Sequence, residues 1–181
     1  MQNYDIDNQR NVFKRLSFYE ILDTVVLSAV FVLLAFTLVF RIFVVSGPSM
    51  NPTLNNGDRL IVSNLFYTPK TGDIICFYSQ YKDEVLIKRV IATEGQTVDI
   101  GDDLCVYVNG LKLNEPYIAG ASTFKSSTPF PYTVAPGTVL VMGDNRMESL
   151  DSRDSRIGPV KLEDIVGRLV LRISPKFGKV N

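Results

Sequence analysis

The first 45 residues contain one long apolar run. Residues 24–40, TVVLSAVFVLLAFTLVF, carry no charge, and residues 42–45 continue the run beyond Arg41. A bilayer core requires about 20 mostly apolar residues. The run is apolar on every face, unlike most helices of soluble proteins, and exceeds the about 7–15 residues of a cleavable signal-peptide core. We therefore predict a transmembrane helix at residues 24–45. The alternative is a cleavable signal peptide, with Val44 and Ser46 as the small residues before the cut.

Basic residues are distributed unevenly around this run. Arg10, Lys14 and Arg15 precede it, whereas the first basic residue beyond Arg41 is Arg59. Lys and Arg are in excess on the cytoplasmic side of membrane helices. The distribution predicts a cytoplasmic segment at residues 1–23 and an extracytoplasmic domain at residues 46–181. The protein would then be a single-pass protein of the plasma membrane, with the lipid bilayer as a partner.

Residues 46–181 show short β-rich runs and no long helical period. Four runs follow a glycine and a polar residue, a turn-then-strand pattern: Gly57-Asp58 before RLIVSN, Gly72-Asp73 before IICFY, Gly95-Gln96 before TVDI and Gly137-Thr138 before VLVM. Residues 85–93 and 166–173 predict longer strands. Asn109-Gly110, between CVYV and LKL, predicts a hairpin because both residues tolerate positive φ. The pattern predicts a mainly β domain with antiparallel pairing.

Residues 101–136 differ from the rest of this domain. They contain the Asn-Gly hairpin and then the polar, Pro-rich passage GASTFKSSTPFPYTVAP. We interpret them as a small β subdomain inserted into the main sheet structure.

The composition of the chain excludes several classes of protein function. The chain has 19 basic and 19 acidic residues, and this balance argues against nucleic-acid binding. It has no histidine, which excludes a Ser-His-Asp triad and removes the usual nitrogen ligand of zinc. Cys76 and Cys105 are far apart, so they are either buried thiols or one disulfide. Asp99, Asp102 and Asp103 lack the ligand spacing of a calcium loop. We expect no metal or cofactor.

Ser49 follows the apolar run on a restricted turn. Gly47, Pro48 and Pro52 surround it and exclude a helix or a central strand. Such a turn can present a hydroxyl outward while neighbouring N–H groups point at a bound carbonyl. A plain linker turn between membrane and domain is the alternative.

Lys88 lies in the predicted strand EVLIKRVIAT. Strand alternation puts Lys88 on the same face as Leu86, Val90 and Ala92. Burial among apolar side chains disfavours the ammonium form and lowers a lysine pKa. A neutral lysine beside a serine hydroxyl can act as general base without imidazole. A lysine at a sheet edge, reaching solvent, is the alternative.

A third segment, GDNRMESLDSR at residues 143–153, follows the apolar strand TVLVM. Its turn formers, hydroxyls and opposite charges predict a loop braced by its own hydrogen bonds. An exposed polar loop with an ion pair between Asp151 and Arg153 is the alternative.

Together these segments closely resemble bacterial type I signal peptidases of the Gram-positive-like branch. The matching motifs, in the family's order, are Ser49-Met50 with Pro52-Thr53-Leu54, Gly57-Asp58, Lys88-Arg89-Val90-Ile91 with Gly95, and Gly143-Asp144-Asn145-Arg146 through Arg153. The resemblance covers nearly the whole chain. It implies an antiparallel-sheet signal-peptidase-type catalytic domain behind one N-terminal transmembrane helix. It also implies a membrane-anchored serine endopeptidase that removes the signal peptides of exported preproteins after small residues of the Ala-X-Ala type.

The resemblance assigns roles to matching residues. Ser49 would be the nucleophile and Lys88 its general base, through an acyl-enzyme. Ser149 would hydrogen-bond the Lys88 amine, and an ion pair between Asp151 and Arg153 would hold the loop. Further supporting residues are Asp144 and Asn145.

Two departures from the family affect these roles. Gly47 stands where many members carry a serine that donates to the oxyanion, so only the Ser49 main-chain N–H is identified as a donor. Asp154-Ser155-Arg156 repeats Asp151-Ser152-Arg153, and the spacing from Asn145 favours the first copy.

Substrate pockets and rival functions complete the expectations. Val45, Met50 and Ile87 flank the catalytic pair and are expected to line a shallow apolar pocket.

A self-cleaving repressor would carry a DNA-binding module, for which the first 23 residues are too short. An inactive membrane-tethered helper of pilus assembly would be expected to lack the serine or the lysine, and both are present.

Overall fold

The computed structural model describes residues 2–118, 120 and 122–180, with the side chains of residues 2–17, 35 and 38 outside the description. The chain divides into two compact units, and the boundary falls between Val39 and Phe40. The site residues predicted from the sequence all belong to the second unit.

The first unit is one helix, α1 (Gln2–Val39). Its described side chains are exposed from Phe18 to Thr37. Among the helical residues that are described, no stretch meets the length and hydropathy required to cross a membrane. The side chains of Arg10, Lys14 and Arg15, which carry the predicted orientation, lie outside the described residues.

The predicted helix end at residue 45 is wrong. Strand β1 (Phe40–Val44) follows α1 directly and pairs antiparallel with β2 (Arg59–Ser63), from Phe40 opposite Ser63 to Val44 opposite Arg59. Aromatic and β-branched residues favour a pleated strand, and the pairing satisfies the backbone groups that would otherwise continue the helix. An apolar run cannot by itself distinguish these two outcomes.

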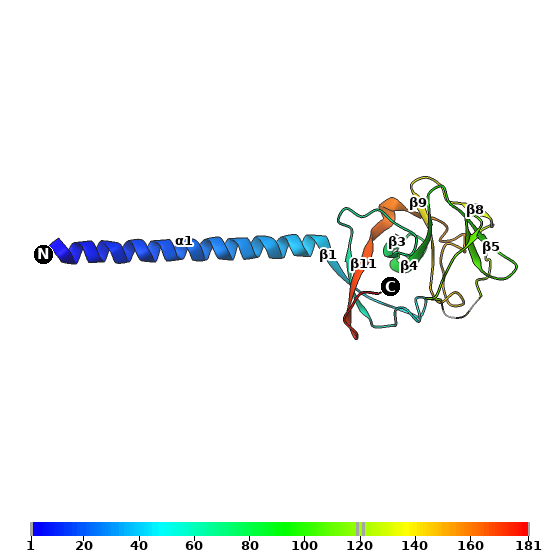
Figure 1. The fold of residues 1–181 in the computed structure, drawn as a ribbon, viewed down its shortest axis with the longest axis horizontal. Coiled ribbons are helices and arrows are strands. Elements are labelled where there is room, and N and C mark those ends of the chain that lie inside the picture. Colours follow the sequence, from blue (N-terminus) through cyan, green and yellow to red (C-terminus); the bar gives the residue numbers. More distant parts are fainter. Residues whose placement is uncertain (1, 119, 121, 181) are drawn as a thin grey trace. The chain divides into compact units, whose positions relative to one another are not determined.

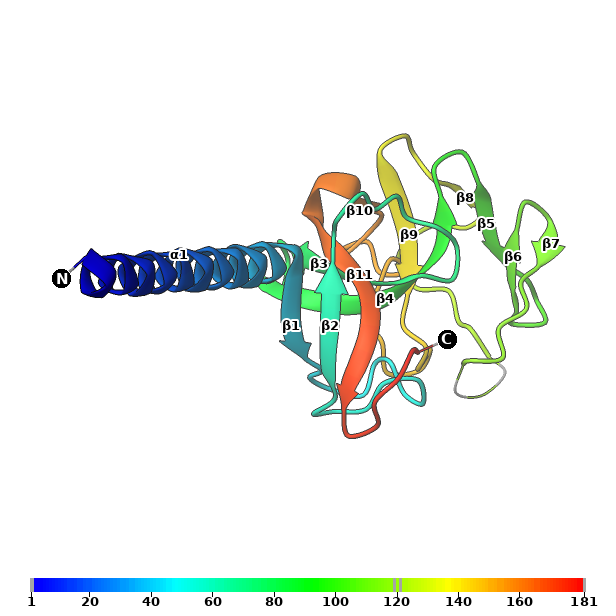
Figure 2. The same cartoon turned by 60° about the vertical axis from the view of Figure 1, so that its left-hand side comes forward.

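The main sheet of the second unit has seven antiparallel strands in the order β1-β2-β11-β3-β4-β9-β10. The remaining strands of this sheet are β3 (Ile74–Ser79), β4 (Glu84–Thr93), β9 (Thr138–Met142), β10 (Val160–Lys161) and β11 (Ile165–Ser174). A 3-10 turn, η1 (Leu162–Asp164), joins the last two. Figure 2 shows β1, β2 and β11 side by side. The predicted mainly β, antiparallel class is confirmed.

A second sheet of four strands has the order β7-β6-β5-β8. Its strands are β5 (Thr97–Ile100), β6 (Val106–Val108), β7 (Leu111–Lys112) and β8 (Tyr132–Thr133). This sheet lies beside the β4 and β9 end of the main sheet in both ribbon views (Figure 1). It starts at Thr97 rather than at about residue 101, because β5 pairs with both β6 and β8 and is therefore one of its two inner strands.

The turn predictions hold where glycine precedes a strand. All four runs that follow a glycine and a polar residue form strands, namely β2, β3, β5 and β9. Asn109 and Gly110 have φ of 52° and 77° and connect β6 to β7, as the hairpin prediction required. Cys76 and Cys105 are both free thiols, and only Cys76 is fully buried.

Candidate active site

Ser49 lies on a tight turn between β1 and β2. The amide of Asn51 donates to the Pro48 carbonyl (2.9 Å), and that of Leu54 donates to the Met50 carbonyl (2.9 Å). The side chains of Met50 and Leu54 are buried in an apolar cluster under this turn. Prolines and local hydrogen bonds therefore fix the backbone, and the burial of Met50 and Leu54 fixes the position of the turn.

Lys88, in the middle of β4, reaches this turn. Its Nζ donates to the Ser49 Oγ at 2.8 Å and to the Ile87 carbonyl at 3.0 Å. Only 3% of the Lys88 surface is exposed. The structure thus places an amine and a hydroxyl from segments 39 residues apart in direct contact, largely out of water.

Burial lowers the pKa of Lys88 to about 8, because the ammonium form loses hydration. Attraction to Asp151, Glu84 and Asp144 raises the pKa, and repulsion by Arg153 lowers it. At a pKa of about 8, roughly one amine in ten is neutral at pH 7. An unperturbed lysine would supply about one in a few thousand.

The strand alternation predicted around Lys88 holds for Leu86 and Val90 but not for Ala92. Leu86 and Val90 belong to one apolar cluster, two residues before and two residues after Lys88. A bulge in the pairing with β9 falls between Val90 and Ala92, and Ala92 packs with Ile91 in a different cluster. The prediction that Ala92 shares the face of Lys88 is therefore wrong, because the bulge shifts the alternation.

The loop after β9 lies directly against the turn that carries Ser49. The amide of Asn145 donates to the Ser49 carbonyl (3.0 Å), and its Nδ2 donates to the Pro48 carbonyl (3.3 Å). A Cβ atom on Gly143 would collide with the Ser149 side chain and with the Ser49 carbonyl oxygen. The predicted supporting residue Asn145 thus contacts the backbone of the turn, and glycine is required beside it.

Asp144 connects three segments of the site. Its carboxylate, which is fully buried, accepts two hydrogen bonds from Arg89, at 2.9 and 2.7 Å. It also accepts one from the Thr53 Oγ1, at 2.5 Å. Asp144 therefore joins the β9 loop to β4, beside Lys88, and to the turn that carries Ser49.

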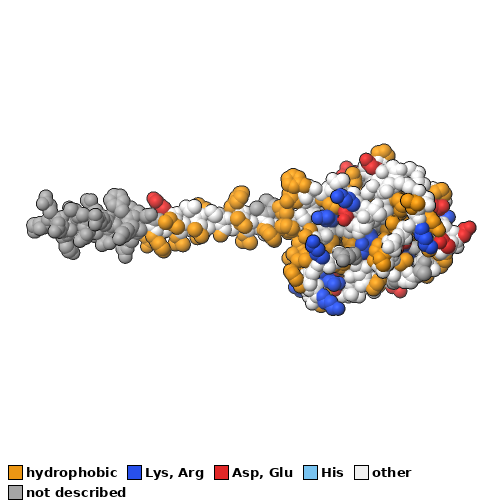
Figure 3. Space-filling model, in the orientation of Figure 1, with side chains coloured by type: hydrophobic (Ala, Val, Ile, Leu, Met, Phe, Trp, Pro, Cys, Tyr) orange, Lys and Arg blue, Asp and Glu red, His pale blue; other side chains and the backbone are white. Residues whose placement is uncertain are grey.

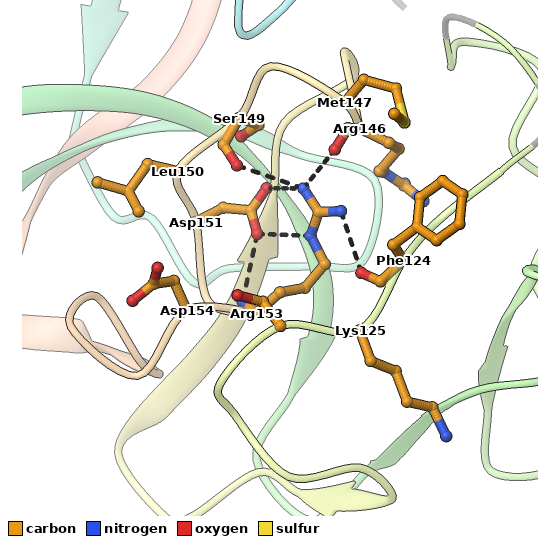
Figure 4. Close-up of a pocket in the computed structure, with 10 residues that line it drawn as sticks. Phe124, Lys125, Arg146, Met147, Ser149, Leu150, Asp151, Arg153 and Asp154 are labelled. Carbon is orange, nitrogen blue, oxygen red and sulfur yellow. Dashed lines mark hydrogen bonds and ion pairs between the residues drawn. The ribbon is translucent and has the colours of Figure 1, made fainter.

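Asp151 and Arg153 form the buried centre of the same loop (Figure 4). Arg153 donates twice to the Asp151 carboxylate, at 2.8 Å each, and Asp151 also accepts from the Gly143 amide at 2.9 Å. The repeated copy pairs Asp154 with Arg156, whose side chain is 53% exposed. Of the two copies, the structure thus places the first one in the loop beside Ser149.

The hydrogen bond predicted between Ser149 and the Lys88 amine is not formed. The Ser149 Oγ is buried and has no hydrogen-bond partner among the described residues. Lys88 donates instead to the Ile87 carbonyl. Ser149 lines a cavity of about 340 Å³, together with Met147 and other residues of this loop and with Phe124 of the Pro-rich passage (Figure 4).

The predicted pocket residues Val45, Met50 and Ile87 come together in one apolar cluster, in which Ile87 is only partly buried. The Gly47 amide, at the position of the expected second oxyanion donor, donates to the Asn56 Oδ1 at 3.0 Å. Among the described groups, none accepts a hydrogen bond from the Ser49 amide. That amide is therefore available to a ligand, whereas the Gly47 amide is engaged.

Nothing in the sequence indicated that the segment between β7 and the Pro-rich passage contributes to the site. Glu115 forms a buried ion pair with Arg146, and the Tyr117 ring lies against the Arg89 guanidinium. Arg146 and Arg89 belong to the recognised motifs, but their partners do not. These partners are separated from the arginines by about 30 residues, so local sequence carried no signal for them.

Comparisons with known proteins agree with this architecture. The sequence profile of the family described as "Signal peptidase, peptidase S26" matches residues 18–174. Signal peptidase I of Bacillus licheniformis is 34% identical over 88% of this chain and 90% of its own length. That of Bacillus caldolyticus is 38% identical over 76% and 81%. The crystal structure of a signal peptidase I from Enterococcus faecalis superposes with a TM-score of 0.51 at 33% identity, covering 57% of this chain and 98% of that one.

The antiparallel fold, with a serine and a lysine at its centre, is thus the fold of a peptidase class. The chain belongs to the signal peptidase family, peptidase S26.

Proposed function

We propose that this protein is a serine endopeptidase that removes signal peptides from exported preproteins, with Ser49 as nucleophile and Lys88 as general base. The observation that carries the proposal is the 2.8 Å hydrogen bond between the Lys88 Nζ and the Ser49 Oγ, formed by a lysine that is 3% exposed. Membership of the signal peptidase family supports the choice of substrate.

The reaction is acyl transfer. The neutral Lys88 amine takes the proton of the Ser49 hydroxyl as the oxygen attacks the scissile carbonyl. Collapse of the tetrahedral intermediate breaks the peptide bond, and the Lys88 ammonium returns the proton to the leaving amine. Water, deprotonated by the same amine, then hydrolyses the ester and restores the free hydroxyl.

The Ser49 amide is the proposed donor to the oxyanion. Preorganised N–H donors stabilise the charge that develops on the carbonyl oxygen. The amide is free of other acceptors among the described groups, and the hydrogen bond from the Asn145 Nδ2 to the Pro48 carbonyl holds the orientation of the Pro48–Ser49 peptide, which carries this amide. Two contacts hold the loop that contains Asn145: Asp144 accepts a hydrogen bond from Arg89, and Asp151, paired with Arg153, accepts one from the Gly143 amide.

The proposed preference for small residues rests on the apolar cluster that Val45, Met50 and Ile87 share. We propose that Val45, Met50 and Ile87 form shallow apolar walls that accept small residues of the Ala-X-Ala type before the cut. Replacing Ile87 by alanine should enlarge this pocket. The variant is then expected to accept larger residues before the cut, and an unchanged preference would contradict the assignment.

We further propose that residues within α1 anchor the protein in the plasma membrane, with the catalytic unit outside. The support is the uncharged run at residues 24–40 and the exposed apolar side chains described along it (Figure 3). Ser49 follows this run closely along the chain, which suits a substrate whose apolar leader lies in the bilayer. Protease protection of the catalytic unit in sealed inverted vesicles is the expected result, and digestion there would contradict the topology.

The test of the function is cleavage of a preprotein by the purified full chain in detergent. Wild-type protein is expected to release the signal peptide, whereas Ser49→Ala and Lys88→Ala are each expected to lose at least about a thousandfold in rate. Near-normal cleavage by either variant would overturn the assignment. If neither cleavage nor acylation of Ser49 by a serine-directed inhibitor occurs in the wild type, a tethered binding module is the better description.

A further inference from the structure

Arg89 is held from several directions at once. Its guanidinium donates to the Asp144 carboxylate at 2.9 and 2.7 Å and to the Gly72 carbonyl at 2.8 Å. The Tyr117 ring lies over the guanidinium, with 3.9 Å between the Arg89 Cζ and the ring centroid. A guanidinium is attracted to the face of an aromatic ring, and more strongly where the pair is out of water. Tyr117 therefore covers the side of Arg89 that water would otherwise occupy.

This arrangement bears on Lys88, which precedes Arg89 in β4. Successive side chains of a strand point to opposite faces, so restraining Arg89 also fixes the backbone rotation that aims Lys88 at Ser49. Restraint of Arg89 also keeps its positively charged guanidinium against the Asp144 carboxylate. Asp144 is one of the carboxylates that favour the ammonium form of Lys88.

Tyr117 is itself held by groups that return to the site. Its hydroxyl donates to the Glu115 Oε1 at 3.1 Å, and Glu115 forms a buried ion pair with Arg146. The Arg146 Nε donates to the Gly143 carbonyl at 3.0 Å, and its Nη1 donates to the Thr123 Oγ1 at 2.6 Å. A continuous polar network thus runs from Asp144 through the inserted segment and back to the glycine beside Ser49.

We propose that Tyr117 is a positioning residue for the Ser49–Lys88 pair, acting by holding Arg89 against Asp144. The proposal rests on the function proposed above for Ser49 and Lys88. Tyr117 makes no contact with Ser49 or Lys88 among the interactions described, so its effect is transmitted through Arg89.

Loss of the ring changes the balance of charge around Lys88. The charged groups that act on Lys88 are Asp151, Glu84, Arg153 and Asp144. Without the ring, water reaches Arg89 and weakens its neutralisation of Asp144, and the backbone of β4 loosens. Both changes favour the ammonium and raise the pKa of Lys88. The pH at which the base becomes available therefore moves up.

The experiment measures kcat/KM for a precursor peptide across the pH range in which the lysine titrates, with the full chain in detergent. For Tyr117→Leu we expect the acidic limb to move up by about half to one pH unit, and cleavage at pH 7 to fall about three- to tenfold. The rate at the alkaline plateau should change less than the rate at pH 7. Tyr117→Phe keeps the ring over Arg89 and is expected to stay within about twofold of wild type.

Tyr81 offers a matched control. Its ring lies 5.0 Å from the Arg156 Cζ in the exposed second copy of the Asp-Ser-Arg sequence. Tyr81→Leu removes the same kind of contact and should leave the pH limb in place. If Tyr117→Leu does not fold, Tyr117→Met, which is apolar but has no aromatic face, serves the same comparison.

An unmoved pH limb in a folded Tyr117→Leu or Tyr117→Met variant would overturn the proposal, even if the melting temperature falls. An equal shift in Tyr117→Phe would also overturn it, because the ring would then not be the cause. Wild-type protein that cleaves no precursor would refute the proposed function instead, so the two failures are distinguishable.

Discussion

No side chain fits at Gly143, because a Cβ atom there would collide with the carbonyl oxygen of Ser49. The same atom would also strike the Ser149 side chain. The constraint is space, since close approach of two backbones leaves no volume for even a methyl group. The loop after β9 can therefore brace the nucleophile turn only with glycine at this position.

For Gly143→Ala we expect a fall of at least about a hundredfold in kcat/KM, because a displacement of about 1 Å at Ser49 misaligns the attacking oxygen. The expected loss of stability is about 1–3 kcal/mol. Gly101→Ala is the control, since its Cβ would crowd Asp103 and Tyr107 away from the catalytic pair. Wild-type cleavage by Gly143→Ala would show that the close approach is not needed.

The ion pairs Asp144–Arg89 and Asp154–Arg156 should differ in their contribution to the stability of the folded protein. Asp144→Asn leaves the Arg89 charge buried without its counter-ion, and such losses are about 3–5 kcal/mol. Asp154→Asn breaks a pair whose arginine is 53% exposed, and we expect little change because water solvates that charge. Chemical denaturation of the two variants measures the contrast. Equal losses of unfolding free energy in the two variants would contradict the view that Asp144 neutralises a buried charge.

The buried Lys88 should destabilise the folded protein. The pKa of Lys88 is lowered to about 8 on folding, so below pH 8 both states bind the proton and the full penalty applies. As the pH rises from about 8 towards 10.5 the unfolded chain binds more protons, and stability due to Lys88 rises. For Lys88→Met we expect a gain of about 2–3 kcal/mol at pH 7 that fades as the pH rises from about 8 and is nearly lost at about 10.5.

The Lys88→Met comparison uses the difference between variant and wild type at each pH, because tyrosines and other lysines titrate in both. Denaturation midpoints at pH 7 and at about pH 10 provide it. A loss of stability at pH 7 would mean that the ammonium is well solvated or well paired.

Ser149 is a second polar side chain whose removal should not lower the stability of the folded protein. Its Oγ is buried without a partner among the described residues, and an unsatisfied buried hydroxyl is unfavourable by about 1–3 kcal/mol. Ser149→Ala should therefore keep or raise the melting temperature. A marked fall would show that the hydroxyl is hydrogen-bonded after all, as the family resemblance implied.

Much of this arrangement was visible in the sequence because its determinants are local. Glycine followed by a polar residue marked the starts of β2, β3, β5 and β9. Asn109-Gly110 fixed a hairpin through its positive φ angles. The prolines around Ser49 indicated a rigid turn, and the apolar neighbours of Lys88 indicated a buried amine.

The features that escaped prediction depend on pairing through space. The apolar run gave no sign that the helix ends at Val39, because the partner of β1 is β2, which follows later in the chain. The bulge beside Ala92 is set by the register with β9. Tyr117 carries no local signal at all, since its importance arises only from its contact with Arg89.

The pH dependence of kcat/KM for precursor cleavage by the wild-type chain shows whether Lys88 is the general base. We predict a single acidic limb with its midpoint at about 8, where Lys88 loses its proton, and no activity in Lys88→Ala at any pH in that range. A midpoint near the ordinary lysine value of 10.5, or a limb that persists in Lys88→Ala, would show that Lys88 is not the base.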